Sequence, residues 1–395
     1  MLEISLTAIK NNYSKLKSLL NDGATCGASV KANAYGLGVA EVATALYARG
    51  CREFFVSSAE EGRKLKEILT KLLAKTLPKP KVSAKSDPKS KPIIYVLHGV
   101  NSHSEVKTVL EAEITPVINN NHQLQLWQVY GNPDLPIALH LDTGLNRLGW
   151  PFEEIAKIPM NLSYCLVMSH LACADEPNHR LNQLQLERFR YVVEYFIRNY
   201  NAHNSRQQKH KPFPKFSLAN SSGIFLGPEY HFDLVRPGYA LYGGMTLDKT
   251  STDITPTLTA KRKMNPVLKL RARIIQKNTV LPSQSIGYGA TYATNSNQIK
   301  TFVIETGYGD GYTRFGTEGA VAWIADHLLP VVGRISMDLT VVDATSLPES
   351  LYNTIEYVEL LNEHITIDDV RKINNNMIGY EFITRLGSRY QRIYT

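Results

Sequence analysis

Eight short apolar runs that alternate with helix-like segments constrain the fold of the N-terminal part of this chain more than any other feature. The runs are Ala24–Val30, Phe54–Ser57, Ile93–Leu97, Thr115–Ile118, Ile137–Leu141, Leu162–Met168, Phe216–Ala219 and Phe232–Val235. Such alternation predicts βαβ units with parallel strands. A closed (β/α)8 barrel explains eight units better than an open, doubly wound sheet does.

Polar residues follow the carboxyl ends of several of these runs. They are Lys31, Asp142, His170, Asn220, Ser221 and Arg236. In a parallel barrel, the carboxyl ends of the strands meet at one mouth, which is where barrel enzymes place their sites. We therefore expect these side chains to surround one functional site.

Lys31 is the most reactive candidate among them. It lies between Val30 and Ala32 at the end of the first predicted strand, and no carboxylate adjoins it in the sequence. Partial burial there lowers the pKa of a lysine and exposes a nucleophilic amine. The alternative is an ordinary surface lysine whose stem lies along apolar neighbours.

The pattern changes after Gly238. Helical periodicity becomes scarce, and β-branched runs separated by turn residues take over. These runs are Leu268–Ile275, Lys300–Ile304, Ala320–Ile324, Val331–Ile335 and Leu339–Val342. We expect a barrel over residues 8–255, with a lysine-rich insertion near 75–92. A β-strand domain would comprise residues 256–395 together with the first strand, in residues 1–7.

The net charge of +8 does not indicate a nucleic-acid site. Residues 71–91 contain seven lysines and one aspartate, so this segment accounts for +6 of the total. It is rich in Pro and Ser and has no aromatic residues that could stack on bases. A second basic stretch, residues 206–215, is similar, and both are interpreted as solvated loops.

Cysteine usage and hydropathy indicate a cytoplasmic protein. Cys26, Cys51, Cys165 and Cys173 show neither a CxxC pair nor the spacing of metal ligands, so we expect free thiols and no metal. No apolar run is long enough to span a membrane, and Met1–Ser5 does not resemble a signal peptide. Phosphate-loop, HExxH and GxSxG motifs are also absent from the sequence.

One nine-residue segment, Val30-Lys31-Ala32-Asn33-Ala34-Tyr35-Gly36-Leu37-Gly38, resembles the Schiff-base lysine segment of alanine racemases. These are pyridoxal 5'-phosphate (PLP) enzymes with a barrel followed by a β domain. Further segments resemble the family in order along the chain: residues 141–149 (LDTGLNRLG), 169–172 (SHLA), 219–222 (ANSS), 235–238 (VRPG), 287–292 (GYGATY), 307–312 (GYGDGY), 333–338 (GRISMD) and 379–381 (GYE).

The resemblance implies a role for each matching position. The two catalytic bases would be Lys31 and Tyr288, and the substrate would bind at Arg147 and Met337. The cofactor would lie against Lys31, Tyr35, His170, Ser221, Arg236, Gly238, Tyr239 and Tyr380, with Asn220, Tyr308 and Asp338 in supporting positions. By resemblance, Tyr288 reaches the site from the other subunit of a homodimer. The activity implied is interconversion of L- and D-alanine, which supplies D-alanine for peptidoglycan.

Two positions carry most of the chemical information. Arg236, facing the pyridine nitrogen, would donate a hydrogen bond without protonating the ring, which limits electron withdrawal and favours simple proton return. His140 is a departure, because many family members carry a carbamylated lysine there that orients the substrate-binding arginine. A histidine cannot hold that carbamate, so a bound anion or another carboxylate would have to orient Arg147.

Three alternatives stay open at this point. A broader-specificity amino-acid racemase needs only a small change in the pocket, since one methyl group alters binding by about 1–3 kcal/mol. A PLP-dependent decarboxylase of the same architecture requires a cysteine in the C-terminal domain, whereas all four cysteines here precede residue 174. A PLP-carrier protein would resemble the barrel alone.

Overall fold

The computed structural model describes residues 1–76, 91–132, 134–207, 212–244, 260, 262–312, 319–369 and 378–395. Most of the lysine-rich insertion, part of the second basic stretch and the predicted domain boundary lie outside these residues. Within the described ranges, no helix is both long and apolar enough to cross a membrane.

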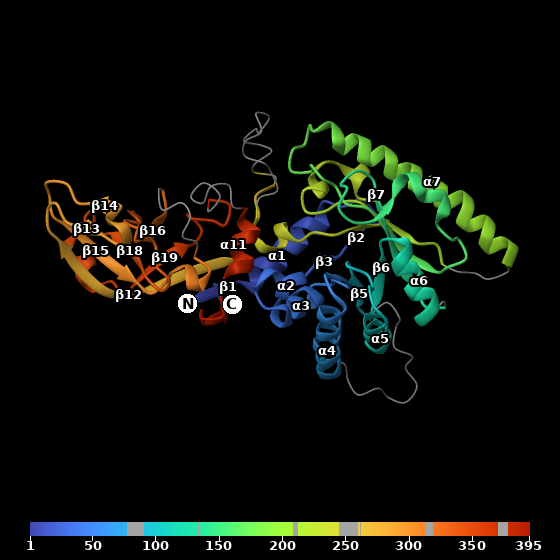
Figure 1. Cartoon of the computed structure of the whole chain (residues 1–395), viewed down its shortest axis with the longest axis horizontal. Coiled ribbons are helices and arrows are strands. Elements are labelled where there is room, and N and C mark those ends of the chain that lie inside the picture. The colour runs from blue at the N-terminus through green and yellow to red at the C-terminus, as the bar shows by residue number, and fades with distance from the viewer. Residues whose placement is uncertain are drawn as a thin grey trace.

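A closed parallel barrel forms the N-terminal part of the molecule and confirms the expected (β/α)8 architecture (right half of Figure 1). The first strand position of the barrel is shared by β2 (Thr25–Cys26) and β3 (Ala28–Ser29). The remaining strands are β4 (Glu53–Val56), β5 (Ile93–Val96), β6 (Thr115–Ile118), β7 (Ile137–Asp142), β9 (Tyr164–Met168), β10 (Lys215–Ser217) and β11 (Leu234–Val235). Backbone bonds from Asp233 to Phe216 (3.0 Å) and from Arg236 to Ala219 (2.9 Å) join β11 to β10. Parallel pairing of β11 with β2 then closes the ring.

Six helices surround the barrel in the part of the chain that the structure describes, and several of them begin at a side-chain cap. They are α1 (Leu6–Ser18), α3 (Val39–Ala48), α4 (Ala59–Thr76), α5 (His103–Glu111), α6 (Asn121–Tyr130) and α7 (Arg180–Gln207). The side chains of Ser5 and Ser102 accept a hydrogen bond from the first turn of α1 and α5, which satisfies a backbone N–H that the helix leaves free.

The alternation of strand and helix is less strict than expected near the end of the barrel. Between β10 and β11 the chain forms two short 3-10 turns instead of an α-helix, and another follows β11. These turns are η3 (Gly223–Phe225), η4 (Pro228–Tyr230) and η5 (Tyr239–Tyr242). A short strand β8 (Trp150–Pro151) and η2 (Phe152–Lys157) are also inserted after β7.

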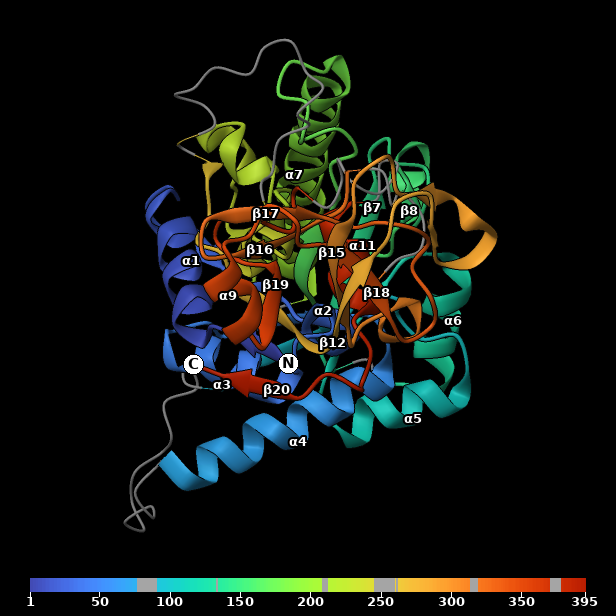
Figure 2. The ribbon, with the colours of Figure 1, turned by 90° about the vertical axis from the view of Figure 1, so that its left-hand side faces the viewer.

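The C-terminal part is mostly β-structure and lies at the left of Figure 1; in Figure 2 it faces the viewer with the barrel behind it. Its strands are β12 (Leu268–Val280), β13 (Ser285–Ile286), β14 (Tyr292–Ala293), β15 (Ile299–Ile304), β16 (Val321–Ile324), β17 (His327–Pro330), β18 (Thr340–Asp343), β19 (Tyr357–Leu361) and β20 (Arg392–Tyr394). Strand β1 (Leu2–Ile4) pairs antiparallel with β12 and parallel with β20, so the N-terminal segment belongs to this sheet.

Some expected boundaries in the C-terminal part were wrong. The apolar run Val331–Ile335 is not a strand and contributes a single bridge, between Val331 and Val342. The strand is His327–Pro330 instead, because Ala325 and Asp326 adopt positive φ and turn β16 back on itself as a hairpin. Two helices, α9 (Glu349–Thr354) and α11 (Gly379–Arg385), were not expected there.

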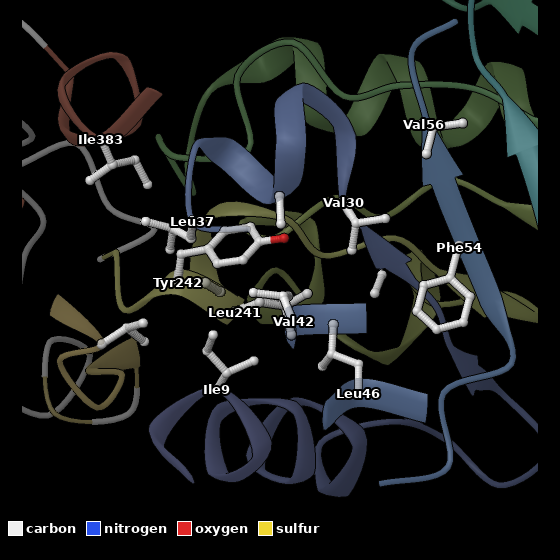
Figure 3. Packing of buried hydrophobic residues seen from close by; sticks show 14 of the residues in the cluster. Ile9, Val30, Leu37, Val42, Leu46, Phe54, Val56, Leu241, Tyr242 and Ile383 are labelled. Atoms are coloured by element: carbon white, nitrogen blue, oxygen red, sulfur yellow. The ribbon is translucent and has the colours of Figure 1, made fainter. Parts of the chain in front are cut away.

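The core continues from the barrel into the C-terminal segment. Figure 3 shows side chains from α1, α3, η5 and α11 converging, among them Ile9, Val42, Leu241, Tyr242 and Ile383. Each of these five is at most 1% exposed. Burial of a large apolar side chain contributes about 1.5–3 kcal/mol. Helix α11 is therefore fixed against the barrel mouth, where it can contribute to a site.

Candidate active site

A cavity of about 910 Å³ lies at the mouth of the barrel. Its wall is formed by residues at or just after the carboxyl ends of the strands. The C-terminal part adds Asp368, residues 378–381 and Thr384. Ten of the residues expected in the site line it: Lys31, Tyr35, Arg147, His170, Asn220, Ser221, Arg236, Gly238, Tyr239 and Tyr380. Residues up to 349 positions apart in the sequence are thus brought to one place.

Lys31 opens a strained segment, α2 (Lys31–Tyr35), at the cavity wall. Four consecutive residues after Lys31 have φ between +51° and +56°, which is left-handed helical geometry. None of the four is glycine, and such geometry costs about 1–2 kcal/mol per residue. A segment of this kind persists only where surrounding contacts fix it.

Several of those contacts come from distant parts of the chain. The carboxylate of Glu61 accepts a hydrogen bond from the N–H of Ala32 at 2.8 Å. At the other end, Arg392 donates to the carbonyl of Gly36 at 3.2 Å, and Tyr394 donates to that of Leu37 at 3.0 Å. The segment is therefore held from both sides.

The surroundings of Lys31 favour an unprotonated amine. Burial lowers its pKa, and the positive charge of Arg147 lowers it further, whereas Glu61 acts in the opposite direction. The pKa of Lys31 is therefore lowered, as the sequence predicts. No carboxylate adjoins Lys31 in the sequence, but helix α4 brings Glu61 close to it from 30 positions away.

Arg236 is a buried cation at the base of the cavity, only 6% exposed. It donates to the carbonyl of Ser169 at 2.5 Å and to the hydroxyl of Ser217. No carboxylate among the described residues forms an ion pair with it, and burial lowers its pKa to about 9. A desolvated guanidinium without a counter-charge is poised to donate to an acceptor atom of a ligand.

Two histidines beside Arg236 are neutral. Burial, together with the charge of Arg236, lowers the pKa of His140 to about 3 and that of His170 well below its ordinary value. The Nδ1 atom of His140 lies 3.0 Å from Oδ1 of Asn119, whose amide nitrogen donates to the carbonyls of Leu97 and Val117. His140 Nδ1 is therefore the donor, and this side chain cannot supply negative charge to a neighbouring arginine.

Ser221 and Gly238 form a small cradle in the cavity wall. The hydroxyl of Ser221 accepts the N–H of Gly238 at 2.9 Å and that of Ala240 at 3.2 Å. A Cβ at position 238 would collide with the hydroxyl of Tyr35, so a larger residue there would displace the Tyr35 ring. Because the Ser221 oxygen accepts these two N–H groups, its own hydroxyl hydrogen is left to donate to an anion such as a phosphate group.

The C-terminal segment completes this wall. The rings of Tyr239 and Tyr380 meet edge to face with centroids 4.7 Å apart, and the Tyr239 hydroxyl donates to Asp368 at 2.6 Å. Both tyrosines and Asp368 line the cavity. Asp368 was not among the expected site residues, and nothing in the local sequence distinguished it.

Arg147 is positioned by a turn that Asp142 organises. The carboxylate of Asp142 accepts the N–H groups of Gly144 and Leu145, both at 2.8 Å, and that of Arg147 at 3.1 Å. Burial would raise the pKa of Asp142, but these backbone bonds outweigh it and lower the pKa. Asp142 thus fixes the backbone of Arg147, and no described carboxylate pairs with its guanidinium.

Four expected residues lie away from the cavity of their own chain. Tyr288 is 70% exposed in η6 (Tyr288–Ala290), between β13 and β14 at the far left of Figure 1. Tyr308 and Met337 are 40% and 53% exposed, and they are adjacent, because the backbones of 308–309 and 336–337 are hydrogen-bonded. Asp338 forms an ion pair with Arg389 at 2.8 Å.

Comparison with known proteins decides the family. The family model for the alanine racemase N-terminal domain matches residues 4–246, and the model for the alanine racemase C-terminal domain matches residues 267–394. The chain belongs to the alanine racemase family. It is accordingly an enzyme, an isomerase of the alanine racemase class.

Individual alanine racemases match over the whole chain. The protein from Rhodospirillum rubrum is 37% identical over 404 residues, which cover 100% of this chain and 95% of that one. The protein from Rickettsia typhi is 36% identical, covering 100% and 98%. Among solved structures, the alanine racemase of Bartonella henselae with covalently bound pyridoxal phosphate has a TM-score of 0.80 and 32% identity, covering 100% and 99%.

The cavity around Lys31 is lined by residues from both matched domains. Sequence reasoning missed Glu61 and Asp368. The signal for Glu61 was present, since Ser58 and Glu61 have capping-box spacing at the loop beside Lys31. Nothing in that spacing revealed that the second carboxylate oxygen of Glu61 would reach the Lys31 segment.

Proposed function

We propose that the cavity binds PLP at Lys31 and that the enzyme interconverts L- and D-alanine with two bases, Lys31 and Tyr288 of a second subunit. One observation carries the proposal: a lysine with a lowered pKa shares a cavity with a buried, uncompensated arginine. The donor set fits the cofactor, since Arg236 can donate to the pyridine nitrogen while Ser221, Tyr35, Tyr380 and backbone N–H groups near Gly238 take the phosphate.

The cofactor, when bound, withdraws electrons from the substrate and so acidifies the hydrogen on its α carbon. Lys31 would remove or return this proton on one face of that carbon. Inversion requires a second proton-transfer group on the other face, for which Tyr288 is the candidate. Arg236 would donate a hydrogen bond to the ring nitrogen without protonating it, which would restrain electron withdrawal and favour return of the proton over other outcomes.

Arg147 and the backbone N–H of Met337 would bind the substrate carboxylate. The turn at Asp142 fixes the backbone of Arg147. Neutral His140 cannot orient the Arg147 guanidinium as the carbamylated lysine of many relatives does, so a bound anion or another carboxylate would take that role. Asn220, Tyr308 and Asp338 would support the site. His170 would lie against the cofactor ring.

We further propose a homodimer in which each site is completed by its partner. This is supported by the exposure of Tyr288, Tyr308 and Met337 and by their absence from the cavity of their own chain. Residues 8–255 would form the cofactor-binding unit, and 256–395 with 1–7 the unit that supplies Tyr288. The enzyme would work in the cytoplasm, in keeping with its four free cysteines, and supply D-alanine for peptidoglycan.

Incubation of the PLP-loaded protein with L-alanine in heavy water tests the assignment. We expect deuterium at the α carbon together with D-alanine on chiral chromatography. The same assay with L-serine and L-lysine would reveal a broader racemase, and release of carbon dioxide would indicate a decarboxylase. Bound PLP without exchange or D-alanine would overturn the proposal.

A further inference from the structure

Three helices of the barrel begin with the same pair of local contacts. The side chain just before the helix accepts the N–H of the residue three positions on, at 3.0–3.3 Å. The side chain of that later residue reaches back to the N–H preceding the cap, at 2.6–2.9 Å. At α4 the cap is Ser58, and Glu61 reaches back to Ser57. At α5 the cap is Ser102, and Glu105 reaches back to Asn101. At α6 the cap is Asn120, and Gln123 reaches back to Asn119.

The comparison shows what this local contact requires. At α6 the later residue is Gln123, whose single amide oxygen is sufficient to bind the backbone N–H. At α5, Glu105 directs one oxygen, Oε2, at its own loop, accepting from the backbone and the side chain of Asn101. A second acceptor oxygen is therefore not needed to begin these helices.

Glu61 uses both of its oxygens, and on different segments. Oε2 accepts the N–H of Ser57 at 2.7 Å, which is the local contact. Oε1 accepts the N–H of Ala32 at 2.8 Å, across 29 positions in the sequence. Ala32 follows Lys31 directly and is the first residue with positive φ in the strained segment. This bond fixes the peptide unit that carries the Lys31 side chain toward the cavity.

We propose that Glu61 is a positioning residue for Lys31, holding the Lys31–Ala32 peptide in the geometry that aims the amine into the cavity. The inference rests on the proposed function, since it assigns a role toward the lysine that would bind PLP. Glu61 also acts through charge. Arg147, from the loop after β7, and His170, after β9, face Lys31 together with Glu61, and Glu61 raises the pKa that burial and Arg147 lower.

Glu61→Gln tests this inference, with Glu105→Gln as its matched control. Both replace the same residue type at the same position of the same capping arrangement, and Gln123 shows that glutamine preserves the local contact. The readout is covalent attachment of PLP to the apoprotein, trapped with borohydride, located by peptide mass and followed across pH. Thermal unfolding of each variant accompanies it.

We expect attachment at Lys31 in Glu61→Gln to slow by about tenfold to a hundredfold, since small misplacements of a reacting group have effects of this size. Its pH midpoint should move to lower pH, because loss of the carboxylate charge makes the ammonium easier to deprotonate. Glu105→Gln should match the unsubstituted chain in both respects. A second variant, Glu61→Asp, keeps the charge but cannot reach both N–H groups, so its rate should fall without that displacement of the midpoint.

Equal rates and midpoints for Glu61→Gln and Glu105→Gln would overturn the inference, as would a Glu61→Asp variant indistinguishable from the unsubstituted chain. Both results leave the proposed function intact, because the unsubstituted chain would still attach PLP at Lys31. Failure of the unsubstituted chain to do so would overturn the proposed function and this inference with it.

Discussion

The segment after Lys31 and the turn that carries Tyr288 are alike in backbone and opposite in surroundings. Both contain non-glycine residues with positive φ, at Ala32–Tyr35 and at Ala290. The first is held by Glu61 and by the C-terminal strand. The second projects from the two-stranded pair β13 and β14, where residues 287–291 are all exposed and Ile286 is the nearest buried side chain.

The two proposed bases therefore differ in how far their own chain fixes them. The surroundings of Lys31 are complete within one chain, so its geometry is fixed before any ligand arrives. The Tyr288 turn has no such surroundings within the described residues of its own chain. In the homodimer proposed above, the barrel mouth of the second subunit would supply those surroundings.

Lys31→Ala should have the largest effect. Racemisation and α-carbon exchange should both fall at least about 10⁴-fold, because the amine is both the attachment point and one of the bases. Chiral chromatography of the product measures it, with Lys107→Ala on the exposed face of α5 as the control. Substantial residual exchange would show that proton transfer does not depend on Lys31 and its fixed surroundings.

Tyr288→Phe should reduce racemisation by about 10²–10⁴-fold while exchange on the Lys31 face persists. Mixing this variant with Lys31→Ala, after unfolding and refolding together, should restore about a quarter of the unsubstituted activity. Half of the dimers are then mixed, and one of their two sites is intact. No recovery on mixing would place both bases within one chain and break the contrast.

Arg236→Lys tests whether the barrel mouth needs the guanidinium group itself or only a positive charge. A lysine ammonium cannot span Ser169 and Ser217 as the guanidinium does, so we expect a loss of about 1–3 kcal/mol in the free energy of unfolding. Activity should fall about tenfold or more. Urea unfolding and steady-state kinetics measure the two effects, and a variant unchanged in both would mean that Arg236 fills space only.

Acidification should destabilise the protein through His140. Its pKa is about 3 in the folded state and 6.5 ordinarily, so the unfolded chain binds more protons between these values and stability falls as pH falls through that window. Between about pH 7 and about pH 5 this amounts to about 2 kcal/mol. His140→Gln should make the urea midpoint less sensitive to pH, and an unchanged pH dependence would contradict the buried, neutral assignment.

The sequence predicted the barrel well because each strand is a contiguous apolar run with a polar residue at its carboxyl end. Lys31, His170 and Arg236 were found in this way. Glu61 was not, because its second contact joins helix α4 to the distant Lys31 segment and leaves no local pattern. The hairpin at Ala325–Asp326 was missed for a different reason: neither residue is the glycine or asparagine that usually marks positive φ.

The bond from Arg392 to the carbonyl of Gly36 joins residues 356 positions apart. A ribosome that adds about 5–20 residues per second needs about 20–70 s to make the intervening chain. During that interval the Lys31 segment is synthesised and its barrel can form, but the strand that holds its far end does not yet exist. Full cofactor capture should therefore be a late event in the life of each newly made molecule.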